Sequence, residues 1–334
     1  MDQLRAHVQK ADRAGEQLPP TGKDLVARQF RDEVEKEFDV KAESCFRCGI
    51  NCHKNVYERN EDGSRGRFLA KFDYEPLNLL STNLGIHDAN LSWQLIKLVD
   101  NLGMDSISCG ATVGYVLDYN ARHPDKPLAN GATFGEFEKI YELIEQTGNG
   151  RLPEVGHGVK RLADKMGEPG YAMHVKGLEL PAYLPDTNPG YAWAIAGGHM
   201  SMGTYLNLAM DKDTSVDYWH TAITQRGLLQ VRDDLIGMCK FAGINNKQAV
   251  DALQAAAGLE VPPDELKAAV RRAYLRGLAL ERKQGYDDTD YTLPAQVFED
   301  PNPNLKTPHF ITTEWFADLK RRVWETFEPE LAQL

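Results

Sequence analysis

Three cysteines occupy the pattern Cys45-x-x-Cys48-x-x-x-Cys52, and His53 follows directly. Thiolates at this spacing are typical of ligands that wrap around a metal ion or an iron–sulfur cluster, and not of a disulfide framework. A fourth ligand must then come from a distant part of the chain, and Cys239 is the candidate. The spacing predicts a [4Fe-4S] cluster. It leaves open a zinc ion held by the same run, with His53 as a further possible ligand.

A second pattern, Asp-x-x-Gly-Met, occurs at residues 100–104 and again at residues 234–238. One copy alone is typical of a helix end, where glycine permits the left-handed turn that closes the helix. The second copy is followed directly by Cys239. The repeat therefore connects the candidate fourth cysteine to one of two similar loops.

Helical patterns dominate the segments that must position these groups. Apolar residues recur at helical spacing in residues 91–104, 134–145, 248–257 and 265–279. Strand-like alternation is rare, and proline and glycine cluster between the helical segments. We predict a mainly α protein with two helical domains, 1–172 with the cysteine run and the first loop, and 173–334 with the second loop. Residues 174–189 are expected to form an extended crossover between them.

The composition excludes some classes of function. The 334 residues carry a formal net charge of -11, which argues against binding to nucleic acid or to anionic membranes. No apolar stretch has the length of a signal peptide or a membrane span, so a cytoplasmic location is expected. Residues 45–71 are locally basic, with six basic and three acidic side chains. This segment is either a solvated loop or a docking patch for an acidic electron carrier.

Taken together, the cysteine run and the paired loops resemble the tungsten-containing aldehyde ferredoxin oxidoreductase family. Further blocks of the resemblance follow in the family's order, at residues 74–75, 83–86, 100–110, 174–183 and 285–294. The resemblance implies two mostly helical domains of that family's type, with the cofactor at their interface. It also implies a [4Fe-4S] cluster and a tungsten (or molybdenum) bis-pyranopterin, with Cys239 as the last cluster ligand.

The resemblance assigns roles to individual residues. A carboxylate at a helix end can hold the amine and amide groups of a pterin ring edge by charge-assisted hydrogen bonds. The implied pterin-binding residues are Asp100, Gly103, Met104, Asp105, Asp234, Gly237 and Met238. In aldehyde-oxidising members, a glutamate acts as general base and a histidine hydrogen-bonds the carbonyl. Glu75 and His199 occupy the matching positions and are the predicted catalytic residues; a helix cap and a buried structural histidine are the alternative interpretations of these two residues.

One departure from the family concerns the front of the chain, because an N-terminal domain that covers the pterins has no counterpart before Cys45. We expect a separate subunit to supply it; a fragment, or a protein without the complete cofactor, are the alternatives. The expected reaction is the oxidation of a small-molecule aldehyde to a carboxylic acid, with electrons passed to ferredoxin or a similar carrier. A low-potential aromatic acyl-CoA reductase subunit and a non-catalytic iron–sulfur electron-transfer subunit remain alternatives.

Overall fold

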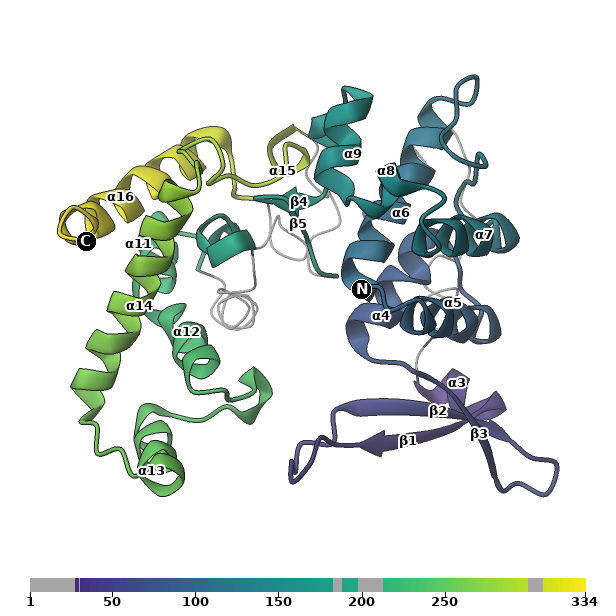
Figure 1. The fold of residues 1–334 in the computed structure, drawn as a ribbon, viewed down its shortest axis with the longest axis horizontal. Coiled ribbons are helices and arrows are strands. Elements are labelled where there is room, and N and C mark those ends of the chain that lie inside the picture. The colour runs from purple at the N-terminus through teal and green to yellow at the C-terminus, as the bar shows by residue number, and fades with distance from the viewer. Residues whose placement is uncertain (1–27, 30, 183–187, 198–212, 300–308) are drawn as a thin grey trace. The chain divides into compact units, whose positions relative to one another are not determined.

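The chain folds into two compact units, Met1–Leu184 and Pro185–Leu334 (Figure 1). The structure is a computed structural model that describes residues 28–29, 31–182, 188–197, 213–299 and 309–334. Both units are mostly helical, which confirms the predicted fold class. The predicted domain boundary between residues 172 and 173 stays a prediction. None of the described helices is both long enough and apolar enough to cross a bilayer.

The first unit combines a small sheet with a helical layer. Its elements are α3 (Arg31–Glu37), β1 (Asp39–Glu43), β2 (His53–Arg59), β3 (Arg65–Lys71), α4 (Tyr74–Leu79), η1 (Thr82–Leu84), α5 (Ala89–Asn101), α6 (Ser106–Arg122), α7 (Phe137–Gly148), α8 (Pro153–Gly156), α9 (Val159–Met166), η2 (Pro169–Tyr171), β4 (His174–Val175) and β5 (Leu178–Glu179).

Helix α6 is the central element of the first unit, because it contacts α4, α5, α7, α8, α9 and β5. Asp105 caps its N-terminus by accepting a hydrogen bond from the Ser108 N–H at 2.8 Å. Gly110 lets α6 approach α4 closely, since a Cβ at this position would lie 2.5 Å from the Leu79 carbonyl oxygen. This approach fixes α4, which carries Glu75, against the helix that starts at the first Asp-x-x-Gly-Met loop.

Strands β1, β2 and β3 form an antiparallel sheet in that order, and β3 packs against α5 (Figure 1). Asp39 pairs with Tyr57 and Glu43 with His53 between β1 and β2, so the cysteine run is the connection that closes this hairpin. The sequence did not predict this sheet. Its strands read DVKAE, HKNVYER and RGRFLAK, in which charged residues hide the alternation of a half-buried strand.

The second unit is built around α14, which contacts α12, α13, α16 and η5. Arg271 and Arg282 of α14 form ion pairs with Glu330 and Glu328 of α16. The elements are η4 (Pro189–Trp193), η5 (Ile195–Gly197), α11 (Val216–Thr221), the π-helical turn η6 (Ala222–Arg226), α12 (Leu228–Leu235), η7 (Lys240–Ala242), α13 (Asn246–Ala257), α14 (Pro263–Lys283), α15 (Gln296–Glu299) and α16 (Thr313–Leu331).

Candidate cofactor-binding site

The cysteine run lies on the loop between β1 and β2, and none of its three thiols is in a disulfide. Cys45 and Cys52 are exposed and Cys48 is half-buried. The residues directly before Cys48 and Cys52, which are Arg47 and Asn51, have left-handed backbone conformations with φ of 57° and 52°. Such conformations are costly for residues with a side chain and concentrate at functional sites. The backbone of the loop is therefore strained at the residue directly before Cys48 and at the residue directly before Cys52.

Polar contacts to sulfur are already present in this loop. The Ile50 N–H donates to Cys48 Sγ at 3.5 Å, a contact of the kind that stabilises a metal-bound thiolate. The Cys45 Sγ lies 3.4 Å from His53 Nε2. These donors suit either a cluster or a zinc ion. Among the described residues, no three His, Cys, Asp or Glu side chains converge on a point that could hold a metal ion. Cys239 belongs to the second unit, so the four-cysteine ligand set stays a prediction.

The first Asp-x-x-Gly-Met loop ends α5. Asp100 is the next-to-last residue of the helix, and its carbonyl accepts the Gly103 N–H at 3.1 Å. The Met104 N–H donates to the Val99 carbonyl at 3.1 Å. Gly103 has φ of 68°, which is the left-handed conformation expected after a helix. The side chains of Asp100 and Asp105 are exposed, while Met104 packs against the core of the unit.

The second loop ends α12 with the same backbone geometry. Asp234 is again the next-to-last helical residue, and its carbonyl accepts the Gly237 N–H at 3.2 Å. The Met238 N–H donates to the Asp233 carbonyl at 2.8 Å, and Gly237 has φ of 68°. Cys239, with φ -69° and ψ 134°, takes the backbone conformation that Asp105 has in the first loop, at φ -70° and ψ 127°. The repeat seen in the sequence is therefore also a repeat in structure.

Comparison with known proteins identifies the family. A model of the aldehyde ferredoxin oxidoreductase family, for its domains 2 and 3, matches residues 21–327. The chain belongs to the aldehyde ferredoxin oxidoreductase family. This finding confirms the resemblance drawn from the cysteine run and the two loops.

About a quarter to a third of the aligned positions are identical between this chain and the following relatives. A tungsten-containing aldehyde ferredoxin oxidoreductase of Pyrococcus furiosus is 28% identical over an alignment of 296 residues that covers 82% of this chain and 48% of the relative. The corresponding protein of Pyrococcus horikoshii is 26% identical, with the same coverage. An aliphatic sulfonate oxidoreductase, WOR-like subunit, of Pyrococcus furiosus is 31% identical over an alignment of 173 residues that covers 46% of this chain and 27% of that subunit. The chain thus spans about half the length of the tungsten-containing relatives.

Glu75 lies in the first turn of α4 and is half-buried. Its Oε2 accepts a hydrogen bond from the Ala182 N–H at 2.7 Å, and the neighbouring Tyr74 hydroxyl donates to the Ala182 carbonyl at 3.0 Å. The hairpin of β4 and β5 brings Ala182 to this position. Burial raises the pKa of Glu75, and the hydrogen bond from Ala182 opposes the rise. The carboxyl therefore combines a structural contact with the raised pKa that a general base near neutral pH needs.

The predicted catalytic histidine, His199, lies outside the described residues. The described residues 188–197 end two positions before His199, and the backbone near this end is strained: Ala196 has φ of 54° and ψ of 23°. The Ala196 N–H donates to Oε1 of Glu281 at 2.6 Å. Glu281 is 3% exposed and was not predicted as a site residue. The sequence places Glu281 on the apolar face of α14, three residues after Leu278 and seven after Tyr274, which could have indicated a buried carboxylate but not its partner.

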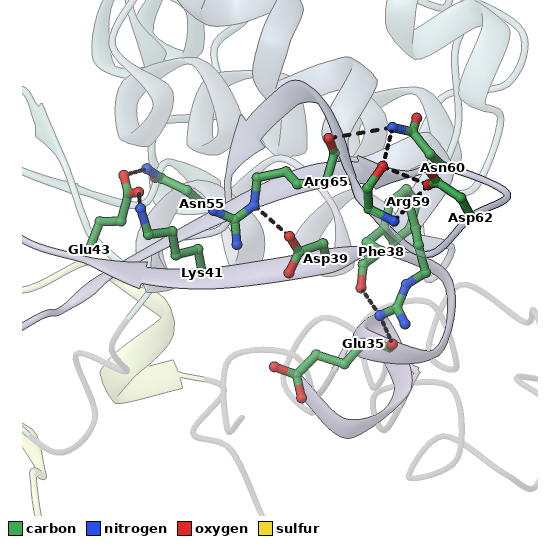
Figure 2. Close-up of polar contacts among 11 residues, drawn as sticks. Glu35, Phe38, Asp39, Lys41, Glu43, Asn55, Arg59, Asn60, Asp62 and Arg65 are labelled. Atoms are coloured by element: carbon green, nitrogen blue, oxygen red, sulfur yellow. Dashed lines mark hydrogen bonds and ion pairs between the residues drawn. The ribbon is translucent and has the colours of Figure 1, made fainter.

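Half of the basic side chains in the segment around the cysteine run are paired with acidic side chains. Arg65 pairs with Asp39 at 2.5 Å, as Figure 2 shows, and Lys71 pairs with Asp73 at 2.7 Å. Both acidic residues lie outside the segment 45–71, and a count within the segment overlooks them. Arg59 donates to the Glu35 and Phe38 carbonyls (Figure 2). Arg67 pairs with Glu58 at 2.7 Å. The surface is therefore less positive than the segment's composition indicates.

Proposed function

We propose that this chain is the cofactor-binding part of a tungsten (or molybdenum) bis-pterin oxidoreductase that oxidises an aldehyde to a carboxylic acid and passes the electrons to ferredoxin. The observation that carries the proposal is the repeated loop, in which Asp100 and Asp234 have the same place at a helix end. A protein that carried only an iron–sulfur cluster would need four cysteines and no such pair of loops.

Asp100 and Asp234 would hold the two pterins through charge-assisted hydrogen bonds, and the main chain around Gly103 and Gly237 would lie close to the rings. Apart from the chain neighbours of each glycine, no atom of the described residues lies within 4 Å of a Cβ built at Gly103 or Gly237, so a ring could approach that side of each turn. Cys45, Cys48, Cys52 and Cys239 would bind the cluster. When bound, the metal pterin would accept two electrons from the substrate, and the cluster would pass them on singly.

Glu75 would act as the general base that takes a proton from the attacking water. Its Oε2 is held by the Ala182 N–H, which fixes the direction of the carboxylate. Among the described residues, Oε1 accepts no hydrogen bond and is open to receive the proton. His199 would donate a hydrogen bond to the aldehyde oxygen as negative charge develops there.

A partner subunit would supply the domain that covers the pterins. One relative is described as a WOR-like subunit, which is consistent with an assembly of several chains.

The test is metal analysis, by mass spectrometry, of the protein purified without oxygen together with any chain that co-purifies, followed by aldehyde-dependent reduction of viologen. We expect about one tungsten or molybdenum atom and about four irons per chain. Asp100→Ala and Asp234→Ala should each release the tungsten while the visible absorption of the cluster persists. Asp88→Ala is the matched control, because Asp88 lies at the opposite end of α5 from Asp100 and caps it.

Two results would contradict the proposal. Retention of tungsten and pterin in both aspartate variants would remove the loops from cofactor binding. Four irons with no heavier metal in the complete complex would favour an electron-transfer subunit. Cys48→Ser tests the cluster separately, since an unchanged iron content in that variant would show that the predicted ligands are wrong.

A further inference from the structure

One face of α14 binds the backbone of residues 193–197 through hydrogen bonds. The Tyr274 hydroxyl donates to the Trp193 carbonyl at 2.7 Å, and Glu281 Oε1 accepts the Ala196 N–H at 2.6 Å. Between them, Gly277 leaves room for Ile195, because a Cβ on Gly277 would lie 3.0 Å from Ile195 Cδ1. Positions 274, 277 and 281 are spaced i, i+3 and i+7, so they share one face of the helix.

Glu281 is itself held from a second direction. The Tyr291 hydroxyl donates to Glu281 Oε2 at 2.8 Å, and the Tyr286 N–H donates to the Glu281 carbonyl at 3.1 Å. Tyr291 is 1% exposed, and its ring packs edge-on against Trp324 of α16 with centroids 4.8 Å apart. Both tyrosines lie in the block 285–294, which resembles the family in sequence and has no role in the proposed chemistry. The block therefore fixes the carboxylate in one orientation.

Residues 193–197 have a backbone conformation that must be stabilised by contacts with other parts of the unit. Ala196 is left-handed at φ 54°, where the Cβ of an L-residue is crowded, and Gly197 follows at φ 82°. A strained alanine persists when surrounding contacts determine its conformation. The hydrogen bond from the Ala196 N–H to a buried carboxyl oxygen of Glu281 is a contact of that kind.

We propose that Glu281 is a positioning residue: it holds residues 195–197 and thereby directs the backbone into the segment that carries His199. This inference rests on the proposed function, because it concerns the histidine of the same active site. Glu281 would touch neither substrate nor cofactor. It acts through the main chain of Ala196, and its acceptor oxygen is the property that matters.

The test compares Glu281→Leu with Glu281→Gln in the cofactor-loaded complex. Glutamine keeps an oxygen that can accept from Ala196, while its amide N–H can donate to the Tyr291 oxygen. We expect Glu281→Gln to retain kcat within about threefold and Glu281→Leu to lose about 10- to 100-fold in kcat, with acetaldehyde as the probe. KM and the tungsten and iron contents should not change. Amide exchange in the peptide covering residues 193–197 should accelerate in the leucine variant and stay slow in the glutamine variant.

Glu265→Leu and Glu265→Gln are the matched controls, because Glu265 is an exposed glutamate on the same helix. Tyr291→Phe is a milder variant if the leucine variant does not fold, and it should move kcat and amide exchange in the same direction by a smaller factor. Wild-type kcat and exchange in Glu281→Leu would overturn the inference, as would equal losses in both Glu281 variants, because charge would then matter and not the acceptor. Absence of aldehyde oxidation by the wild-type complex would instead contradict the proposed function, and the exchange experiment would still decide whether Glu281 holds the segment.

Discussion

Asp100 and Asp234 stand where a carboxylate is electrostatically unfavourable. Each is the next-to-last residue of its helix, beside carbonyl groups that carry the negative end of the helix dipole. Other acidic residues follow the opposite preference, as Asp88 does when it accepts the Asn90 N–H at 2.7 Å at the start of α5. Hydrogen-bond donors of a bound cofactor would offset the cost at the helix ends.

This placement predicts that Asp100→Asn stabilises the cofactor-free chain while weakening cofactor retention. Removing the charge relieves its repulsion from the helix end, and the gain should be about 0.3–1 kcal/mol in the free energy of unfolding. Asp88→Asn makes the same substitution at the other end of α5 and should lower stability by a similar amount. Urea titration of the two variants measures the sign of each change in the free energy of unfolding. Destabilisation by Asp100→Asn would contradict the electrostatic argument.

The raised pKa of Glu75 predicts how activity depends on pH. Because burial raises its pKa, the acidic limb of the profile of kcat/KM should have its midpoint above the usual range of a glutamate, and activity should rise with pH through it. Glu75→Gln should lose about two or more orders of magnitude in kcat and should also lose this limb. The glutamine oxygen can still accept from Ala182, so the contact with α4 survives.

The same shift in pKa has a consequence for stability. A carboxyl whose pKa is raised by folding stabilises the folded state at low pH, and this contribution is lost as the pH rises through the folded pKa. Glu75→Gln should therefore raise the melting temperature of the cofactor-free chain at neutral pH relative to wild type. Glu138→Gln is the control, since Glu138 is an exposed acid in the first turn of α7. A wild-type rate in Glu75→Gln would remove Glu75 from the mechanism.

At the scale of elements, the end of α6 is joined to η2 by a charged network. Arg122 and His123 both bind the Glu168 carboxylate, with 2.6 Å between His123 Nε2 and Glu168 Oε1. Burial by itself raises the pKa of Glu168, but the hydrogen bonds from Arg122 and His123 overcome it, and the net pKa is lowered. The Arg122 guanidinium also lies 3.8 Å from the centre of the Tyr171 ring in η2.

We expect Glu168→Gln to lower the free energy of unfolding by about 1–3 kcal/mol at neutral pH, because hydrogen bonds to charged donors are weakened. A lowered pKa means that this stability is present above the unfolded pKa and is lost as the pH falls through the folded pKa. The difference from wild type should therefore shrink below about pH 4. Asp164→Asn, which breaks the exposed pair with Lys160, should cost less than about 0.5 kcal/mol. A penalty for Glu168→Gln that does not depend on pH would contradict the network.

The helices were predictable from the sequence because their periodicity is local. The pattern at residues 265–279 corresponds to α14 (Pro263–Lys283), and the pattern at 248–257 to α13 (Asn246–Ala257). The sheet was not predictable, since its charged side chains find partners across strands, as Arg65 and Asp39 do in Figure 2. Pairing of this kind joins residues far apart in sequence and leaves no periodic signal.

The same distinction holds for the candidate site: local motifs were predictable from the sequence, and contacts between distant residues were not. Motifs within a few residues indicated the cysteine loop and both aspartate loops, and the family match covers the part of the chain that contains them. The role of Glu281 depends on a contact with Ala196, which lies 85 positions away in the chain. No local sequence pattern identifies the two partners of that contact, so it is seen only in the folded structure.

At the scale of the whole molecule, the chain corresponds to about half the length of the tungsten-containing relatives. If a partner covers the pterins, the chain produced alone should carry about four irons but little tungsten, and co-production with the partner should restore the heavier metal. Metal analysis of both preparations measures this difference. Full tungsten occupancy in the chain produced alone would show that no covering subunit is required.

Under the proposed function, electron transfer to ferredoxin should depend weakly on salt. Three of the six basic side chains of residues 45–71, Arg65, Arg67 and Lys71, are paired with acidic side chains, so less positive charge is left to attract an acidic carrier than the composition indicates. The KM for ferredoxin should change by less than about threefold between about 0.05 and 0.3 M NaCl. Steady-state kinetics at several salt concentrations measure it, and a steep rise in KM would show that a positive docking patch operates.

The π-helical turn Ala222–Arg226 interrupts what would be one continuous helix from α11 to α12. A π-helical turn holds one residue more than an α-helical turn, so removal of one residue there would restore regular winding and leave the helix after it facing nearly the same way. The buried Arg232 and Asp233 and the exposed Asp234 would then keep their directions. The direction in which the second loop faces should thus tolerate the deletion of a single codon within this turn, whereas the same deletion inside α12 would rotate the loop by about 100° around the axis.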